Sequence, residues 1–261
     1  MRMILLVIAL IFSLAAPGQI SKYKTAGRID DLQTVYVYQK SNWDGTHASQ
    51  IFLYVADSNR LESFKWTSGD KTATLVTATI DWESFSVSRF TNHRLEQGQV
   101  PRLVATLQFD GKKQINIEVG TMRDSLLLQG LPWQSYDFDF AGLGFTWRAL
   151  VDKTDSFDFF IADAAMVNNN IQFVNKGKVT VYYKNNVLID GKPCLLYEAD
   201  GTGLEHKGGQ IWINAVTLMI EQYKISLPDE PGFENGMLKL LRTEKMMPAA
   251  WEVFKNRSVG N

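Results

Sequence analysis

The sequence predicts a mainly β fold: one or more curved antiparallel sheets, or an open barrel, built from two related hairpin-rich halves, with a short crossover helix and a C-terminal helix. Three observations lead to this prediction. Apolar residues recur with period two, turn-forming residues separate the runs, and one hairpin pattern occurs twice. Such alternation is typical of antiparallel strands that bury one face. A length of 261 residues suits a single domain of this kind.

The N-terminal segment has the composition of an export signal. Arg2 provides positive charge, and the apolar run from Met3 to Ala16 is too short to span a bilayer comfortably. Small residues at its end favour cleavage after Gly18, while an uncleaved membrane anchor is the alternative. We therefore expect residues 1–18 to be a signal peptide, residues 19–261 to form a single β-rich domain, and the protein to be periplasmic or secreted.

The first half contains seven runs with the alternation of strands. The turns between them include Asp57-Ser58-Asn59, Ser68-Gly69-Asp70 and Asp110-Gly111-Lys112, and these residue types adopt the conformations that tight hairpins need. We expect a meander in which each strand pairs with the next. The expected strands are Val35 to Tyr38, Gln50 to Val55, Leu61 to Trp66, Ala73 to Ile80, Ser84 to Phe90, Leu103 to Phe109 and Gln114 to Val119.

The pattern is interrupted and then resumes. Leu131 to Asp163 is predicted to be a crossover that contains at most a short helix near Phe145 to Leu150. Turns are expected at Asn185-Asn186 and Asp190-Gly191, and the apolar residues of Glu244 to Lys255 have the spacing of a helix packed on the sheet. The strands expected in this half are Ile171 to Val174, Lys178 to Lys184, Pro193 to Glu198, Gln210 to Ile213, Met219 to Leu227 and Met237 to Leu241.

One hairpin pattern occurs in both halves. In each copy an Asp or Asn starts a turn by accepting hydrogen bonds from its own downstream backbone, and later apolar residues return to the buried face. Chance similarity between two hairpins of equal loop length is the alternative. We predict pseudo-repeats at about 30–130 and 165–245. The matching positions are Ile80, Asp81, Ser84, Val87 and Phe90 in the first copy, and Ile213, Asn214, Thr217, Ile220 and Tyr223 in the second.

The second copy carries a family resemblance. Gly209-Gln210-Ile211-Trp212-Ile213-Asn214, followed by Thr217 and Ile220, resembles the periplasmic half-barrel proteins typified by lipoprotein carriers and related domains of unknown function. The resemblance covers mainly residues 171–227 and, more weakly, 50–90. It implies a strongly curved antiparallel sheet around an apolar cavity that holds acyl chains or another hydrophobic ligand. The chain departs from the carriers in its greater length and in its long central insertion.

Several kinds of chemistry have no support in the sequence. With 27 Lys and Arg against 28 Asp and Glu and no clustered basic run, there is no footprint for nucleic acid. Cys194 is the single cysteine, so it forms no intrachain disulfide, and we expect it to be a buried strand residue. His47, His93 and His206 lie far apart in the sequence, so we name no metal ligands and expect no cofactor.

Catalytic motifs are equally sparse. There is no Gly-x-Ser-x-Gly elbow, and Gly201-Thr202-Gly203 lacks the strand-to-helix context of a phosphate loop. Asp137 and Asp139 alternate with aromatic residues and therefore share one face, as a glycosidase pair or a calcium site would require, although a solvated strand face explains them as well. We assign no catalytic residue, and the sequence favours a binding protein over an enzyme.

An aromatic cluster is the most useful candidate site. Its density suits the lining of an apolar ligand pocket or a plug at the open end of a curved sheet, although ordinary core packing is the alternative. The cluster consists of Trp133, Tyr136, Phe138, Phe140, Phe145 and Trp147.

Three functions follow from these observations. We expect a non-catalytic binding or carrier module at the cell envelope, with a lipid or another hydrophobic or amphipathic molecule as its ligand. The first alternative is a secreted hydrolase of carbohydrates or esters that uses Asp137 or Asp139 with a histidine such as His206. The second is a structural or interaction protein of the envelope that binds partners through the edges of its sheet.

Overall fold

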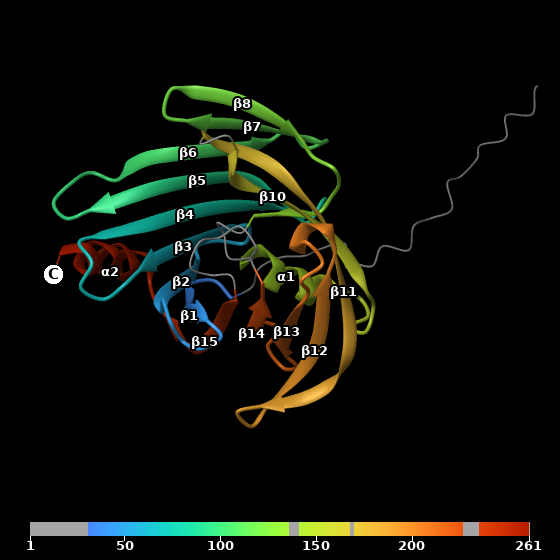
Figure 1. Cartoon of the computed structure of the whole chain (residues 1–261). Coiled ribbons are helices and arrows are strands. Elements are labelled where there is room, and N and C mark those ends of the chain that lie inside the picture. Colours follow the sequence, from blue (N-terminus) through green and yellow to red (C-terminus); the bar gives the residue numbers. More distant parts are fainter. Residues whose placement is uncertain (1–30, 136–140, 168–169, 227–234, 261) are drawn as a thin grey trace, which may run out of the picture.

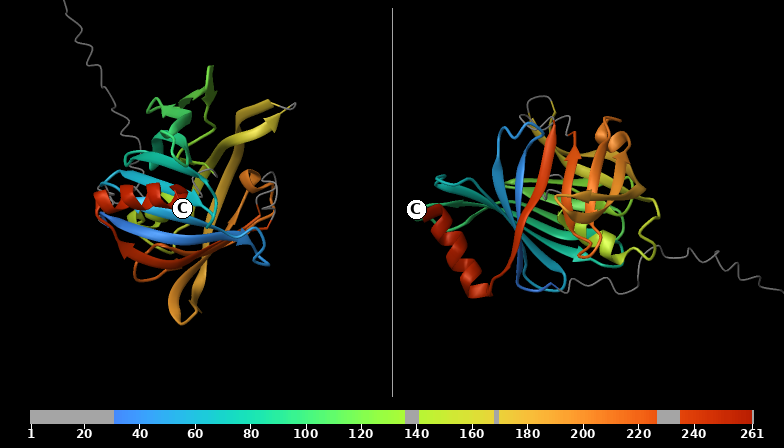
Figure 2. Two further views of the ribbon diagram at one scale, coloured as in Figure 1. Left: turned by 90° about the vertical axis from the view of Figure 1, so that its left-hand side faces the viewer. Right: turned by 90° about the horizontal axis from the view of Figure 1, so that it is seen from below.

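The computed structural model describes residues 31–135, 141–167, 170–226 and 235–260. Within them, fifteen strands form one hydrogen-bonded sheet that ends at β8 on one side and at β9 on the other. The sheet curls around helix α1 (Ala141–Ala149), and helix α2 (Pro248–Gly260) covers part of its outer side (Figures 1 and 2). The predicted fold class, a curved and unclosed β-sheet with two helices, is therefore confirmed.

The strands follow each other along the chain in two meanders. The first contains β1 (Thr34–Asn42), β2 (Ser49–Val55), β3 (Arg60–Trp66), β4 (Thr72–Asp81), β5 (Ser86–Glu96), β6 (Arg102–Phe109), β7 (Gln114–Val119) and β8 (Met122–Leu127). The second contains β9 (Trp133–Gln134), β10 (Phe157–Val167), β11 (Asn170–Ile189), β12 (Lys192–Asp200), β13 (Gly209–Asn214), β14 (Ile220–Ile225) and β15 (Gly236–Lys245).

The two meanders join through the first and last strands. β1 pairs antiparallel with β15, from Thr34 opposite Lys245 to Asn42 opposite Gly236, with a bulge near Tyr38. All other neighbouring strands are also antiparallel except β9 and β10, which run parallel. Of the helices in the described part of the chain, none has the length and apolar character needed to cross a membrane.

The two hairpins with matching sequences have the same local geometry. Asp81 Oδ1 accepts a hydrogen bond from the backbone N–H of Glu83, and Asn214 Oδ1 accepts one from Val216, which confirms the predicted Asx turns. Ile80 pairs with Val87 as Ile213 pairs with Ile220, and each pair follows a bulge. The larger pseudo-repeat of about 30–130 and 165–245 stays a prediction.

Several predicted boundaries are wrong. Asn185 and Asn186 do not form a turn, because strand β11 continues through them and absorbs the irregularity as a bulge after Tyr183. Strand β8 was not predicted because its side chains are mostly exposed and show no alternation, and β10 begins inside the predicted crossover and extends beyond it. Helix α1 begins four residues earlier than expected, and α2 runs from Pro248 to Gly260, since β15 extends to Lys245.

The buried apolar side chains along β1 to β3 belong alternately to two separate hydrophobic cores. Tyr36 and Tyr38 lie in the larger core on the inner side of the sheet, whereas Val35 and Val37 lie in the smaller core on its outer side. Successive side chains of a strand point to opposite faces, so these strands are apolar on both. The outer core exists because α2 covers that face with residues such as Trp251.

A buried polar network fixes α2 to the sheet. Trp251 Nε1 donates a hydrogen bond of 2.7 Å to Glu62 Oε2, and Lys255 Nζ lies 3.0 Å from the same oxygen. The Trp251 ring also stacks on Tyr54 at 4.9 Å between centroids. A buried carboxylate is stable only when it is paired and hydrogen-bonded, so Glu62 requires the helix in this position.

Side-chain contacts tie the two ends of the sheet together. The backbone N–H of Trp133 in β9 donates to Ser86 Oγ at the start of β5. Asn175 of β11 donates from Nδ2 to the carbonyl of Leu127 in β8 and accepts from the N–H of Gln129. These contacts bring the ends close together without forming a strand ladder between them, which leaves the sheet open but strongly curved.

We predict that Trp251→Ala lowers the free energy of unfolding by about 3–5 kcal/mol, the usual cost of removing a large buried aromatic side chain. Urea unfolding followed by circular dichroism measures the change. Val253→Ala is the matched control on the same helix, because Val253 is 47% exposed, and it should change stability by less than about 0.5 kcal/mol. Equal effects for the two variants would show that α2 is not fixed to the sheet through Trp251.

Candidate functional site

Three of the six predicted aromatic residues are described, and all three are buried inside the curved sheet. Trp133, Phe145 and Trp147 are 1%, 2% and 0% exposed. They belong to the inner core, which the structure brings together from β9, α1 and the concave face. Tyr136, Phe138 and Phe140 lie outside the described residues, as do Asp137, Asp139 and the predicted signal peptide.

Helix α1 fills the space inside the sheet (Figure 1). The Trp147 ring makes edge-to-face contacts with Phe157 of β10, at 5.1 Å between centroids, and with Tyr197 of β12, at 5.4 Å. Gly144 faces the opposite wall, where a Cβ atom would make an ordinary contact of 3.6 Å with Met219 Cε. A small space of about 10 Å³ lies between this part of the helix and β1, β2, β14 and β15.

Arg148 holds the C-terminal end of α1 through polar contacts with two other segments. Its Nη2 lies 2.6 Å from Asp31 Oδ2, and its Nε donates to the carbonyl of Thr217 at 3.0 Å. Tyr36 joins the network, because its hydroxyl donates to Asp31 and accepts from Arg148. Burial, assisted by the hydrogen bond to Asp31, raises the pKa of Tyr36 well above its ordinary value. Arg148 thus connects the end of α1 to Asp31, Tyr36 and Thr217.

Lys153 closes the last turn of α1. Its ammonium group donates to the carbonyls of Arg148 and Leu150, where a helix end leaves acceptors unpaired and favours positive charge. The carbonyl of Lys153 accepts a hydrogen bond of 2.5 Å from the hydroxyl of Tyr197, a buried residue of the concave face. The segment after α1 is therefore attached to the same wall that Trp147 contacts.

Strand β9 leaves two buried polar atoms without hydrogen-bond partners among the described residues. They are Trp133 Nε1 and Gln134 Oε1. An unsatisfied buried polar group costs about 1–3 kcal/mol. The neighbouring Ser135 hydroxyl is paired, since it donates to Asp163 Oδ2 at 3.1 Å in β10.

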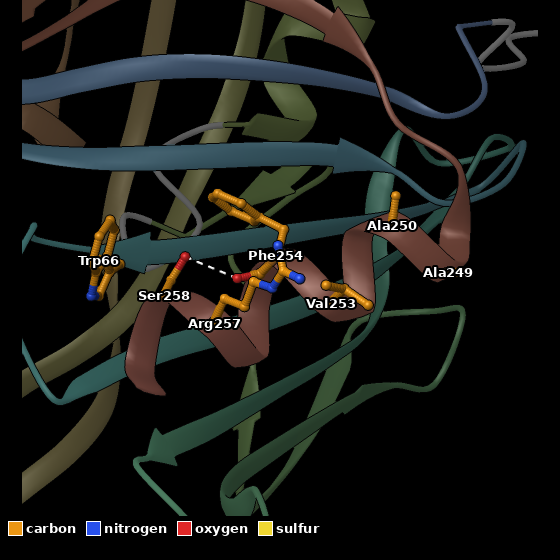
Figure 3. Close-up of a pocket in the computed structure, with 7 residues that line it drawn as sticks. All are labelled: Trp66, Ala249, Ala250, Val253, Phe254, Arg257 and Ser258. Atoms are coloured by element: carbon orange, nitrogen blue, oxygen red, sulfur yellow. Dashed lines mark hydrogen bonds between the residues drawn. The ribbon is translucent and has the colours of Figure 1, made fainter. Parts of the chain in front are cut away.

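The outer side of the sheet carries a separate hollow beside α2. It has a volume of about 670 Å³ and lies between the exposed side of the helix and Trp66 (Figure 3). Its surface is mostly apolar, and the Ser258 hydroxyl is occupied by a hydrogen bond to the carbonyl of Phe254. The lining residues are Trp66, Ala249, Ala250, Val253, Phe254, Arg257 and Ser258.

The three histidines lie in separate segments of the structure and contact different residues. His206 lies 3.8 Å from Asp200, and both side chains are largely exposed. His47 contacts Asn42 in the turn after β1, and His93 belongs to β5. In the described ranges, no three His, Cys, Asp or Glu side chains gather closely enough to hold a metal ion.

Cys194 lies buried in β12, in agreement with the prediction of a strand residue. Burial raises the pKa of its thiol, and the nearby Glu221 carboxylate acts in the same direction. A nucleophilic or metal-binding cysteine needs the opposite shift. Gly201 has a φ of +148°, and a Cβ atom added there would lie only 2.2 Å from the carbonyl oxygen of Lys178. The close approach of the β11 backbone therefore requires glycine at this position.

Sequence reasoning did not find the contacts that fix α1. Arg148 lies within the predicted helix, but nothing in its spacing indicates Asp31 or Thr217 as partners. Those contacts depend on how the sheet curls. The alternation of Tyr36 and Tyr38 along β1 was the one local signal that this strand faces the interior.

Comparisons with known proteins give a limited result. No family model and no curated protein sequence matches the chain. Among solved structures, an outer membrane lipoprotein-sorting protein domain from Vibrio parahaemolyticus matches at 6% identity and a TM-score of 0.23, covering 87% of this chain and 90% of that one. A DUF1329 family protein from Desulfovibrio piger matches at 10% identity and a TM-score of 0.23, with 88% and 92% covered.

One of these descriptions names lipoprotein sorting and the other a family of unknown function, as in the group of proteins that the sequence resembles. A TM-score of 0.23 carries no functional argument. Proposals for this protein therefore depend on its own geometry.

The buried tyrosines predict a loss of stability at alkaline pH. Burial raises the pKa values of Tyr36, Tyr38 and Tyr197 in the folded protein. Unfolded phenols ionise near pH 10, so the unfolded state loses protons first. The contribution of these tyrosines to the free energy of unfolding should therefore be constant below about pH 9 and fall as the pH rises through about 10.

Urea unfolding between pH 8 and pH 11 tests this prediction. Tyr197→Phe loses the hydrogen bond to Lys153 and should be about 1 kcal/mol less stable at pH 8, but its decline above pH 10 should be shallower than that of the wild type. Tyr182→Phe is the control, because Tyr182 is 48% exposed. An identical alkaline slope for wild type and Tyr197→Phe would contradict the argument.

Proposed function

We propose that the protein is a non-catalytic binding or carrier module for a hydrophobic or amphipathic ligand at the cell envelope. The observation that carries this proposal is the concave face of the sheet, which is apolar from β2 across β1 and β15 to β12. In the described part of the chain, one short helix occupies the space inside it. An open sheet with an apolar interior is suited to take up an apolar molecule.

The size of α1 supports exchange of the helix for a ligand. A helix of nine residues is ~13.5 Å long and about 10 Å across, so it occupies on the order of 1,000 Å³. Ligand pockets range from about 300 to 1,000 Å³. Withdrawal of α1 would therefore free enough volume for an acyl chain, and the ligand would cover the apolar wall that the helix leaves.

The attachment of α1 supports the same proposal. Its apolar contacts are of the kind that a hydrophobic ligand can replace, and the polar contacts that fix it are concentrated at Arg148 and Lys153. Phe145 and Trp147 leave with the helix or line the ligand, and Trp133 stays on the wall as part of β9. We propose these ligand-binding roles also for Tyr136, Phe138 and Phe140, which complete the aromatic cluster.

Location and organisation complete the proposal. A signal peptide at residues 1–18, with a single β-rich domain at 19–261, places the protein in the periplasm or outside the cell. Two related halves at about 30–130 and 165–245 account for one cavity wall made from two similar meanders. The shared hairpin geometry at Asp81 and Asn214 supports this duplication.

Native mass spectrometry of the protein isolated gently from its own envelope tests the proposal. The expected result is an additional mass that disappears on denaturation and that has the fragmentation pattern of a lipid. Protein stripped of lipid should gain thermal stability from a panel of monoacylglycerols and phospholipids, because a ligand that binds only the folded state stabilises it. An empty native protein with no thermal response to any lipid of the panel would contradict the proposal.

We further predict that Arg148→Ala increases the affinity for a neutral lipid. Arg148 contacts Asp31 and Thr217 only while α1 fills the interior. The variant loses these contacts, so the free energy needed to withdraw the helix is lower. A loss of about 1.4 kcal/mol in that cost corresponds to about tenfold tighter binding. Titration with monolaurin, followed by isothermal calorimetry, measures the change.

Hydrogen exchange at residues 143–150 provides the second measurement, since these amides should exchange faster in Arg148→Ala. Arg123→Ala is the matched control, because Arg123 is highly exposed and pairs only weakly with Glu118 in the β7–β8 hairpin. Slower exchange or weaker monolaurin binding in Arg148→Ala would show that α1 does not compete with the ligand.

A further inference from the structure

One row of side chains crosses seven neighbouring strands on the inner side of the sheet. Each member lies directly opposite the next in the pairing register. Side chains directly opposite each other point to the same face. From β15 to β6 the row consists of Leu240, Tyr38, Ile51, Lys65, Thr74, Arg94 and Arg102.

The chemistry of this row changes abruptly between β2 and β3. Tyr38 and Ile51 are buried members of the inner core, and they border the small space beside Gly144 of α1. Lys65, directly opposite Ile51, begins a stretch in which three of four side chains carry a positive charge. Along this row the inner side is therefore apolar as far as β2 and cationic from β3 to β6, while other positions of those strands, such as Leu61 and Val76, belong to the apolar inner core.

A cleft lies at the cationic end of the row. It has a volume of about 220 Å³ and combines two cationic side chains with four hydroxyl groups. Cations and hydroxyl donors are the groups that bind phosphate and related oxyanions most strongly. The lining residues are Ser49, Lys65, Trp66, Thr67, Asp70, Thr72, Ala73, Thr74 and Arg94.

Arg94 and Arg102 are an unfavourable pair in the protein alone. Like charges directly opposite each other on neighbouring strands destabilise a sheet. Glu96 lies 2.7 Å from Nε of Arg94, and Asp70 lines the cleft. A bound anion would lower the repulsion between Arg94 and Arg102.

The spacing suits a single anionic group. Neighbouring strands are about 4.8 Å apart, so the Cα atoms of Lys65 and Arg94 are separated by roughly 10 Å, with Thr74 between them. Both side chains are long enough to meet over the threonine hydroxyl. Ile51 lies one strand further, about 5 Å from Lys65, where the apolar part of a ligand would begin.

We propose that this cleft binds a phosphate-class oxyanion as the head of an amphipathic ligand, whose apolar tail lies on the inner face beside Tyr38 and Ile51. The inference rests on the proposed function, because the tail occupies the space that α1 vacates. It adds the chemical class of the ligand: an acyl or alkyl phosphate rather than a neutral lipid. Lys65 and Arg94 bind the head from the lining of the cleft, Arg102 adds positive charge from its position opposite Arg94, and the hydroxyl groups of Ser49 and Thr74 donate to its oxygens.

Calorimetric titration with three ligands tests the inference on the full chain. Dodecyl phosphate carries both parts of the proposed ligand, monolaurin carries a chain of equal length with a neutral head, and inorganic phosphate carries the head alone. We expect the wild type to bind dodecyl phosphate at least tenfold more tightly than monolaurin at low salt. This preference should shrink as the salt concentration rises, because the cleft is open to solvent.

The double variant Arg94→Gln and Arg102→Gln should lose about tenfold in affinity for dodecyl phosphate and bind monolaurin as the wild type does. Arg89→Gln is the matched control, since Arg89 is an exposed arginine on the same strand at a position of opposite alternation. Arg102→Gln alone provides a measurement without ligand: removal of one of two facing charges should raise the unfolding temperature at low salt and have a smaller effect at high salt.

The possible results distinguish failure of the anion site from failure of the binding function. Equal affinities of the wild type for dodecyl phosphate and monolaurin, or an unchanged affinity of the double variant for dodecyl phosphate, would overturn the anion site while leaving the binding function intact. Absence of binding for both lipids would overturn the proposed function itself. Inorganic phosphate binding as tightly as dodecyl phosphate, and lost in the double variant, would mean that the cleft serves a free oxyanion and that the amphipathic ligand is wrong.

Discussion

The pairing register of one continuous sheet determines which side chains meet in this protein. Every strand from β8 to β9 is hydrogen-bonded to its neighbours, so a shift of one residue in any pair would move a whole set of side chains to the other face. In β1 to β3 both faces are apolar, and the inner and outer cores depend on the same register. The bulges near Tyr38, Tyr183 and Ile213 adjust the register locally without breaking the sheet.

The interior of the curved sheet is occupied by a helix of the same chain. The described apolar residues of α1 are buried. Trp147 packs against one wall of the sheet and Gly144 against the other. Apolar packing supplies most of its stability, whereas Arg148 determines its position through directional contacts with Asp31 and Thr217. Apolar contacts are easily exchanged for those of a ligand, and directional contacts are not. The position of the helix is thus set by few residues and its stability by many.

Period-two alternation was sufficient to predict the fold class and most strands from the sequence. Asp81 and Asn214 predicted their Asx turns because those hydrogen bonds are local. The same local reasoning failed at Asn185-Asn186, where pairing with Leu195 and Leu196 of β12 holds the backbone extended, and at β8, whose exposed side chains lack the alternation. Propensity for a turn loses to a hydrogen-bonded ladder when the ladder is long.

The candidate site was only partly predictable. The aromatic density around Trp147 indicated burial correctly, since large aromatic side chains dominate cores wherever they occur. The row from Ile51 to Arg102 could not be seen in the sequence, because its members come from separate strands and share a face only once the pairing is known. Contacts of this kind require the register of each hairpin, and one bulge is enough to change it.

The pairing of β1 with β15 also determines when folding can finish. The central ladder of the sheet joins residues near position 34 to residues near position 245, so neither meander gains its inner neighbour until almost the whole chain has been synthesised. Until then each meander has an edge strand without a hydrogen-bonded neighbour, and the apolar side chains of that strand are not yet covered. Contacts so distant in sequence form slowly. The edge of β1 that faces β15 in the folded protein therefore stays open to other pairings until the last strand has been made.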